Sequence, residues 1–400
     1  MKTPLRLLPT PLLRPVFCLL LLAASSASRA APDVPAYAQT LRPRIEEVLK
    51  QTLAPGAVVL VKSAQGNWEQ AFGTRTLGGK DAVGIDDHFH VGSVTKTWTG
   101  TVILQLAQEG RLGLSDPISR HVKGVPNGSH ITIEQLLNMR SGLFNYTRDT
   151  AFIKRMERDP YHVYRPDDLL AIAFRHPPAF APGAQYAYSN TNTVLLGKVI
   201  EKVTGRPVAV EMQRRLFTPF GLGHTSLPRA GKTRLPAPYA RGYQYGPIGD
   251  EGGQAQSAAS QDAQAGVTLL RDATNWNRSW AWTAGGGIST ARELAAFVER
   301  MVGGGYLQPE WQKQRLESCL PTDPANTGPD SLHYGWGLGR VGRYYGHTGQ
   351  LPGYNTYMLH NPDTRTTIIV WTSLSSGPND RQPAIEIGNL IIAELDSQKS

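Results

Sequence analysis

The sequence lacks any run of about eighteen apolar residues, the length that a membrane-spanning helix needs, so no such helix is expected. It has only two cysteines, Cys18 and Cys319, which excludes a disulfide scaffold, an iron–sulfur cluster and a cysteine-rich zinc site. No block of Lys or Arg stands out, so nucleic-acid binding is not indicated. Hydrophobic residues make up 40% and charged residues 18%, as in a globular protein. We expect neither a metal nor a cofactor.

The first thirty residues have the pattern of a secretory signal peptide. Lys2, Arg6 and Arg14 precede an apolar run from Val16 to Ala24, and small residues follow up to Ala30. We expect cleavage after residue 30 and export to the periplasm or the cell exterior. Cleavage removes four basic residues and no acid, which lowers the formal net charge from +9 to +5. The alternative, a buried N-terminal helix, is disfavoured by the prolines in this segment.

Hydrophobic periodicity predicts strands near both ends of the mature chain. Residues 58–61 and 68–72 form an expected hairpin around Gly66-Asn67, and residues 354–359 and 367–371 form a second strand pair. We therefore expect an α/β (α+β) fold in which an antiparallel sheet is built from both chain ends and flanked by helices. The expected helices cover residues 41–53, 97–108, 133–138, 193–203, 290–301 and 383–395.

The middle of the chain is predicted to be an inserted all-helical domain. The sheet domain would take residues 31–115 and 273–400, and the helical domain residues 116–272. Within the latter, about 243–266 is rich in Gly, Gln, Ala and Ser and is predicted to be a mobile loop.

Ser93 and Lys96 form an S-x-x-K motif where the predicted helix 97–108 begins. Positions i and i+3 share a helix face, so Lys96 can stand beside Ser93 and activate its hydroxyl as a nucleophile. The alternative is an ordinary capping serine followed by a solvated lysine.

Two further motifs follow along the chain. Tyr188-Ser189-Asn190 is a Y-x-N, in which a nearby ammonium would favour a phenolate base; the alternative is a helix cap by Asn190. His347-Thr348-Gly349 precedes the C-terminal strands, where the backbone N–H of Gln350 could face an oxyanion.

In this order the three motifs resemble those of the serine β-lactamase and penicillin-binding protein superfamily. They look most like the exocellular serine D-Ala-D-Ala carboxypeptidases, which are related to class C β-lactamases. Longer blocks share the resemblance, at residues 89–110, 131–146, 180–205 and 280–290.

The resemblance implies an acyl-enzyme mechanism in a cleft between the sheet and the helical domain. Ser93 would be the nucleophile, Lys96 and Tyr188 would share the general-base role, and Asn190 would hold a substrate amide. The backbone N–H groups of Ser93 and Gln350 would form the oxyanion hole. Further implied substrate contacts are His347, Thr348, Gly349 and Trp280.

Two departures from the resembled enzymes concern substrate specificity. Gln350 replaces a hydroxyl residue, and Gly339 stands where an Arg that binds the substrate carboxylate is expected. Arg340 is the predicted substitute, because a guanidinium suits a carboxylate. The leading expectation is an exported D-alanyl-D-alanine carboxypeptidase that acts on peptidoglycan stem peptides. Its substrates would be such peptides or other small acyl compounds, with β-lactams as covalent inhibitors or substrates. A D-aminopeptidase, an esterase, a class C-like β-lactamase or a non-catalytic penicillin-binding receptor stays open as an alternative, and so does the oligomeric state.

Overall fold

The computed structural model describes Met1 and residues 34–229, 231–248, 269–326, 328 and 330–397. The expected signal peptide, apart from Met1, and residues 249–266 of the expected mobile loop lie outside these described residues. The described residues from 34 to 397 group as one compact unit, so the domain boundaries at 116 and 272 stay a prediction. In the described part, no helix is both long and apolar enough to cross a membrane.

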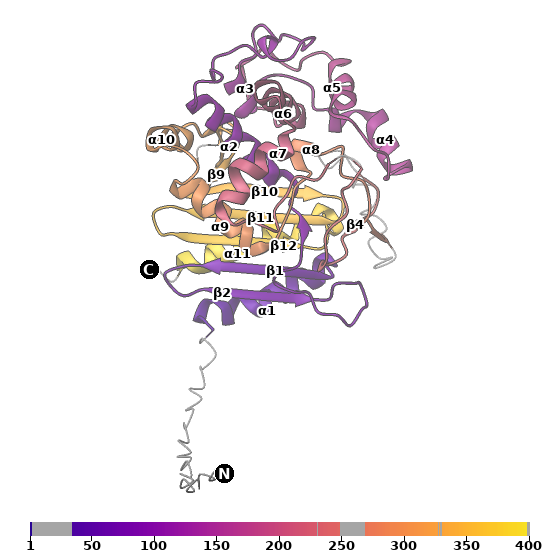
Figure 1. Ribbon diagram of the computed structural model, residues 1–400. Coiled ribbons are helices and arrows are strands. Elements are labelled where there is room, and N and C mark those ends of the chain that lie inside the picture. The colour runs from indigo at the N-terminus through magenta and orange to yellow at the C-terminus, as the bar shows by residue number, and fades with distance from the viewer. Residues whose placement is uncertain (2–33, 230, 249–268, 327, 329, 398–400) are drawn as a thin grey trace. The chain divides into compact units, whose positions relative to one another are not determined.

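An eight-stranded antiparallel sheet forms the centre of this unit (Figure 1). Its strand order is β2-β1-β12-β11-β10-β9-β8-β7, so the first hairpin pairs directly with the last strand. This arrangement confirms the expected sheet from both chain ends. The strands are β1 Gly56–Lys62, β2 Trp68–Gly73, β7 Leu320–Pro321, β8 Leu332–Tyr334, β9 Gly339–Val341, β10 Tyr344–Leu351, β11 Tyr354–Asn361 and β12 Thr366–Thr372.

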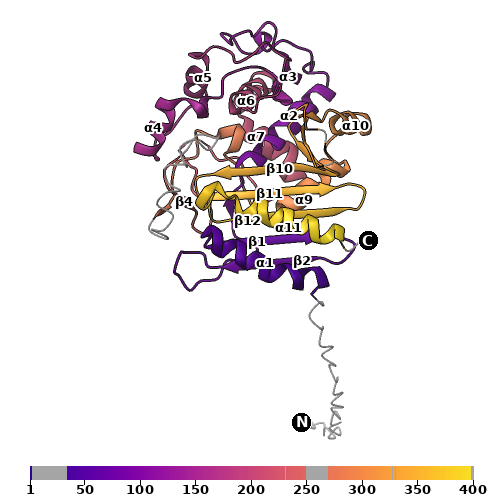
Figure 2. The same ribbon diagram turned by 180° about the vertical axis from the view of Figure 1, so that it is seen from behind.

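Strand β1 shows why the sheet needs helices on both faces. Val58 and Leu60 belong to one buried core, whereas Val59 and Val61 belong to another, because successive side chains of a strand point to opposite faces. Helices α1 (Ala36–Thr52) and α11 (Pro383–Ser397) cover one face, side by side. Helix α9 (Ala291–Gly303) covers the other, as the two views show (Figures 1 and 2).

Most other helices gather beyond β10, on the side of the sheet away from β2 (Figure 1). A capping box between Thr132 and Gln135 fixes the start of one of them, α3. The helices of this group are α2 Thr95–Gln108, α3 Ile133–Leu137, α4 Thr150–Arg158, α5 Pro166–Phe174, α6 Asn190–Thr204, α7 Val208–Met212, α8 Trp282–Gly285 and α10 Pro309–Glu317.

Two short ribbons accompany the main sheet. Strand β3 (Phe89–His90) pairs with β6 (Ile288–Ser289), and β4 (Tyr243–Tyr245) pairs with β5 (Leu270–Asp272). Strand β4 corrects the prediction of a loop from residue 243. Both of its tyrosines are buried in the core shared with α1 and α11, and the Tyr243 N–H donates to the Ser373 carbonyl. Side-chain burial therefore ordered a segment whose composition indicated a loop.

Strand β10 loses one neighbour part-way along its length. Strand β9 pairs with it only at Tyr344, Tyr345 and Gly346, whereas β11 continues to pair up to Leu351. The backbone of residues 347–351 therefore faces the turn Gly92–Val94, which precedes α2, in place of a strand.

Candidate active site

Ser93 and Lys96 come together at the start of α2. Ser93 lies in the 3-10 turn Gly92–Val94, and Lys96 follows in the first turn of the helix. The Lys96 Nζ donates to the Ser93 Oγ at 3.1 Å. Ser93 is partly exposed, whereas Lys96 is only 1% exposed. The i, i+3 spacing thus places a buried amine behind an accessible hydroxyl.

Three acceptors surround the Lys96 amine. Besides Ser93, it donates to the Asn190 Oδ1 at 2.6 Å and to the Ala284 carbonyl of α8 at 2.7 Å. These partners are all acceptors, which suits an ammonium group as the donor.

Tyr188 and Asn190 lie at the start of α6, next to this ammonium. The Lys96 Nζ is 4.7 Å from the centre of the Tyr188 ring, so the two residues predicted to share the general-base role lie next to each other. The Asn190 Nδ2 donates to the Thr147 Oγ1 at 3.3 Å, and its backbone N–H donates to the Asn145 Oδ1 at 3.1 Å. These bonds hold the amide so that its oxygen faces Lys96.

His347 lies on β10 with both ring nitrogens engaged. Its Nδ1 is 2.5 Å from the Thr348 carbonyl, and its Nε2 is 3.1 Å from the Tyr334 hydroxyl. Burial, together with the charge of Lys96, lowers the pKa of His347 to about 3. Burial also raises the pKa of Tyr334, so the hydroxyl donates to a neutral imidazole. His347 consequently offers no positive charge to a substrate carboxylate.

The backbone around Gly92 brings the nucleophile loop against β10. Gly92 has φ +58°, and a Cβ at this position would lie 2.7 Å from the Gln350 nitrogen. Only glycine allows both this conformation and this approach. The Gln350 N–H therefore lies beside the Ser93 turn, as an oxyanion hole requires.

A cleft of about 830 Å³ opens at these residues. Its described lining includes Ser93, Tyr188, Trp280 and the β10 residues from His347 to Gln350. Phe152, Ile153 and Met156 add apolar lining next to Trp280, and the Phe152 and Trp280 rings are 6.1 Å apart. Most of the predicted site residues are thus brought to one cavity.

Arg340 is the exception among the predicted site residues. Its neighbours on β9, Gly339 and Val341, line the cleft, but Arg340 does not. Arg340 pairs with Tyr345 of β10, and its charge partly offsets the burial that raises the pKa of Cys319, so the guanidinium acts at that thiol. The structure does not bring this guanidinium to the site, which corrects the predicted substitute.

Four residues of the site were not predicted from the sequence. Asn145 and Thr147 hold Asn190, Ala284 accepts from Lys96, and Tyr334 donates to His347. Asn145 falls within the block 131–146 that carried the resemblance, which was the available signal. Ala284 likewise falls within the block 280–290 of the resemblance. The contacts of Thr147 and Tyr334 depend on tertiary packing that no local pattern reveals. Among the described residues, no cluster of His, Cys, Asp or Glu is placed to hold a metal ion.

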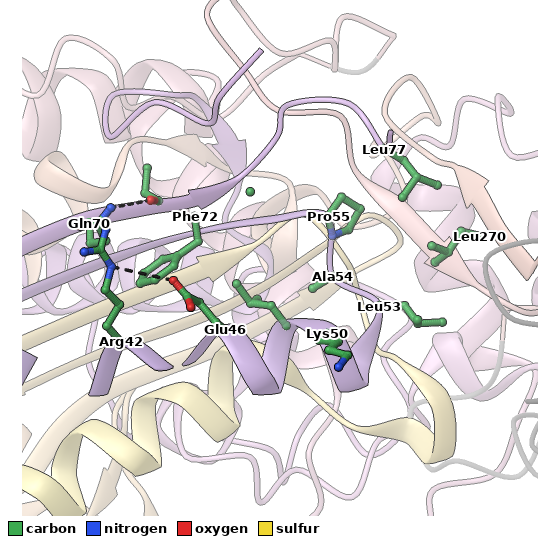
Figure 3. A pocket seen from close by; sticks show the side chains of 13 residues that line it. Arg42, Glu46, Lys50, Leu53, Ala54, Pro55, Gln70, Phe72, Leu77 and Leu270 are labelled. Carbon is green, nitrogen blue, oxygen red and sulfur yellow. Dashed lines mark hydrogen bonds and ion pairs between the residues drawn. The ribbon is translucent and has the colours of Figure 1, made fainter. Parts of the chain in front are cut away.

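A second hollow, of about 490 Å³, lies between α1 and β2 (Figure 3). Arg42, Glu46 and Lys50 of the helix face Gln70 and Phe72 of the strand across it. Its described lining contains no Ser, Cys or His, and Arg42 and Glu46 are 59% and 60% exposed. The described lining of this hollow therefore offers no serine or cysteine nucleophile.

Known proteins resemble this chain over most of its length. The sequence model of the Beta-lactamase family matches residues 41–390. Penicillin-binding protein 4* of Bacillus subtilis is 25% identical over 321 residues, which cover 78% of this chain and 67% of that protein. The chain spans about two thirds of the length of the curated relatives that it matches.

Solved structures share the fold. A D-stereospecific amidohydrolase from a Streptomyces species is 31% identical, with a TM-score of 0.73, covering 88% of this chain and 98% of that one. The D-amino acid amidase of Ochrobactrum anthropi SV3 is 24% identical and has the same TM-score. The match covers 90% of this chain and 100% of the amidase, and at this identity it shows a shared fold alone. The sequence model of the Beta-lactamase family matches nearly the whole described chain, and the protein therefore belongs to this family.

Proposed function

We propose that this protein is a serine hydrolase that cleaves amide bonds of D-amino acid derivatives through an acyl-enzyme on Ser93. The observation that carries the proposal is the 3.1 Å hydrogen bond between Lys96 Nζ and Ser93 Oγ at the wall of the cleft. A serine hydroxyl needs such a neighbour to become a nucleophile. The likeness to the D-stereospecific amidohydrolase from Streptomyces, at 31% identity, supports the substrate class.

In the proposed reaction, Ser93 Oγ adds to the amide carbonyl carbon while its proton passes to the Tyr188 phenolate. Lys96 acts as the cation that stabilises this phenolate, so the two residues share the general-base role. The C–N bond breaks as the same proton moves to the leaving nitrogen. Water then attacks the ester by the reverse proton route and releases the acid and free Ser93. The backbone N–H groups of Ser93 and Gln350 stabilise the oxyanion in both halves.

Hydrolysis of phenylalaninamide tests this proposal. The purified chain and its Ser93→Ala variant are incubated with the D- and the L-isomer, and released ammonia is measured. We expect release from the D-isomer that depends on Ser93, and a penicillin adduct on Ser93 by mass spectrometry. The proposed acyl-enzyme would be contradicted if the chain showed no Ser93-dependent hydrolysis and formed no adduct on Ser93.

A second candidate is a D-alanyl-D-alanine carboxypeptidase acting on peptidoglycan stem peptides. The similarity to penicillin-binding protein 4* favours it. Its test is the release of free D-Ala from an N-acylated peptide that ends in D-Ala-D-Ala. We also propose that the protein is exported, on the pattern of residues 1–30.

A further inference from the structure

Arg278 is a buried cation next to the cleft that the proposed mechanism does not use. It is 1% exposed, and burial lowers its pKa to about 10, so it stays protonated at neutral pH. No Asp or Glu among the described residues offsets this shift. A buried charge without a carboxylate partner costs folding free energy, so other hydrogen bonds must stabilise it.

Three backbone carbonyls bind the Arg278 guanidinium in place of a carboxylate. Nη1 donates to the Trp276 carbonyl at 2.6 Å, and Nη2 donates to the Ala273 carbonyl at 2.6 Å and to the Pro352 carbonyl at 2.7 Å. The first two carbonyls lie in the segment that contains Arg278, whereas Pro352 lies in the turn between β10 and β11. The planar guanidinium therefore connects two distant segments through charge-assisted hydrogen bonds, which are stronger and more directional than neutral ones.

The segment that carries Arg278 leads directly to one wall of the cleft. Trp280 follows two residues later and lines the cleft, and the Tyr146 hydroxyl donates to its carbonyl at 2.6 Å. Helix α8 comes next, and its Ala284 carbonyl accepts from the Lys96 amine at 2.7 Å. A displacement of this segment would therefore move both the aromatic wall and a partner of the catalytic amine.

The turn at Pro352 leads to the oxyanion donor on the other wall. Pro352 lines the cleft and comes two residues after Gln350, whose backbone nitrogen lies beside Gly92. Gly353 has φ +102°, and a Cβ at this position would lie 3.5 Å from the Arg278 Nη2. The turn thus leaves the guanidinium room to reach the Pro352 carbonyl.

Helix α8 and the end of β10 also lie close together. A Cβ added to Gly285 of α8 would lie 3.6 Å from the Gly92 carbonyl carbon and 3.7 Å from the Leu351 Cδ2. The two walls therefore approach each other at α8, and the Arg278 hydrogen bonds connect them at a second point. Two such points fix the orientation of one wall relative to the other.

We propose that Arg278 is a positioning residue that sets the distance between the Trp280 wall and the Gln350 oxyanion donor, and thereby determines which acyl side chains react. Trp280, Phe152 and Met156 give the cleft an apolar lining for a substrate side chain, whereas the Gln350 N–H determines where the reacting carbonyl oxygen lies. A misplacement of about 1 Å between the binding and the reacting groups costs about 10²-fold in rate. This inference rests on the proposed function and deepens it.

The ratio of two substrates tests this role independently of folding. We would measure kcat/KM for D-phenylalaninamide and D-alaninamide with the wild type, Arg278→Met and Arg278→Lys. A variant that is only less folded loses the same fraction of activity on both amides, so stability does not move the ratio. We expect the preference for the larger amide to fall about tenfold in Arg278→Met. In Arg278→Lys it should fall about threefold, because the ammonium keeps the charge but lacks the two-nitrogen fork.

Arg215→Met is the matched control. The Arg215 side chain is 8% exposed and donates to Glu211 and Glu109, and none of these three residues belongs to the described cleft lining. We expect this variant to melt at a lower temperature and to keep the wild-type ratio. A wild-type ratio in Arg278→Met would overturn the positioning role. Should Arg278→Met fail to fold, a wild-type ratio in Arg278→Lys would overturn it in the same way.

Acylation by penicillin separates this inference from the function that it rests on. Mass spectrometry follows the formation of the Ser93 adduct, which we expect to be about tenfold slower in Arg278→Met and unchanged in Arg215→Met. A wild-type chain that forms the adduct but hydrolyses neither amide would overturn the proposed substrate class. The adduct rates would then decide the role of Arg278, and equal rates in wild type and Arg278→Met would overturn it. A chain without an adduct and without Ser93-dependent hydrolysis would overturn both proposals.

Discussion

The cleft beside β10 and the hollow beside β2 differ in how their polar groups are held. In the hollow, Arg42 and Glu46 are exposed and 3.8 Å apart, so water competes for both. In the cleft, Lys96, Asn190 and His347 are 1%, 4% and 8% exposed, and protein atoms bind each of them. Burial makes such groups costly unless they are paired, and pairing fixes their geometry. The contrast indicates that a reactive site is recognised by its restrained polar groups, and not by the presence of a cavity.

The largest expected effect comes from removing the ammonium of the cleft. Lys96→Met should lower kcat/KM for a D-amide by about 10³-fold or more, because Ser93 loses its activating neighbour. Glu46→Gln, its counterpart in the hollow, should leave kcat/KM unchanged. Circular dichroism of both variants confirms folding. Equal activities in the two would remove the functional distinction between the cavities.

Two glycine-to-alanine substitutions separate the effect of a close contact at the site from the effect of a positive φ angle. Gly92→Ala places a Cβ 2.7 Å from the Gln350 nitrogen and should displace that oxyanion donor, which lowers kcat by about 10²-fold. Gly110→Ala has a similar φ of +70° but open space around it, so it should cost only about 1 kcal/mol of stability. Thermal melts and steady-state rates measure both. A Gly92→Ala enzyme with full kcat would exclude the assigned oxyanion geometry.

The buried imidazole of the cleft should make stability depend on pH. The pKa of His347 falls from its usual 6.5 to about 3 on folding, so between these values the unfolded state binds a proton that the native state does not. The free energy of unfolding should therefore decrease as the pH drops from about 6.5 towards 3, by up to about 1.4 kcal/mol per pH unit.

Urea unfolding at several pH values measures this slope. His347→Gln should flatten it, whereas Glu46→Gln should not. Identical slopes in wild type and His347→Gln would mean that this imidazole is charged in the native state.

The smallest effect is expected in the hollow itself. Arg42→Ala removes an exposed ion pair with Glu46, one helical turn away, and should change the free energy of unfolding by less than about 0.5 kcal/mol. Chemical denaturation measures it, and rates on a D-amide should not change. A large loss of activity here would make the hollow a second functional site.

Local patterns in the sequence were sufficient for most of the sheet and for the nucleophile. The hairpin 58–72 and the strands 354–371 follow from hydrophobic alternation around turn residues, and S-x-x-K at a helix start puts Lys96 beside Ser93 by helical geometry alone. The motif Y-x-N could be placed on the same site only through the family resemblance.

The remaining errors arise where tertiary contacts decide. Tyr243 and Tyr245 belong to a segment with the composition of a loop, yet the apolar core orders them. Arg340 was assigned by its chemistry, although the fold leaves its guanidinium outside the cleft lining, where its charge acts on Cys319. Tyr334 reaches His347 only because β8 and β10 lie on either side of β9 in the sheet.

The unpaired stretch of β10 after Gly346 has a consequence for solubility. An exposed strand edge is a template on which further chains can add and aggregate. Here β9 ends at the cleft, and the turn at Gly92 approaches Gly349 so closely that a Cβ on that residue would overlap the Val91 carbonyl. The turn therefore occupies space beside this part of the edge that a strand added from another chain would need.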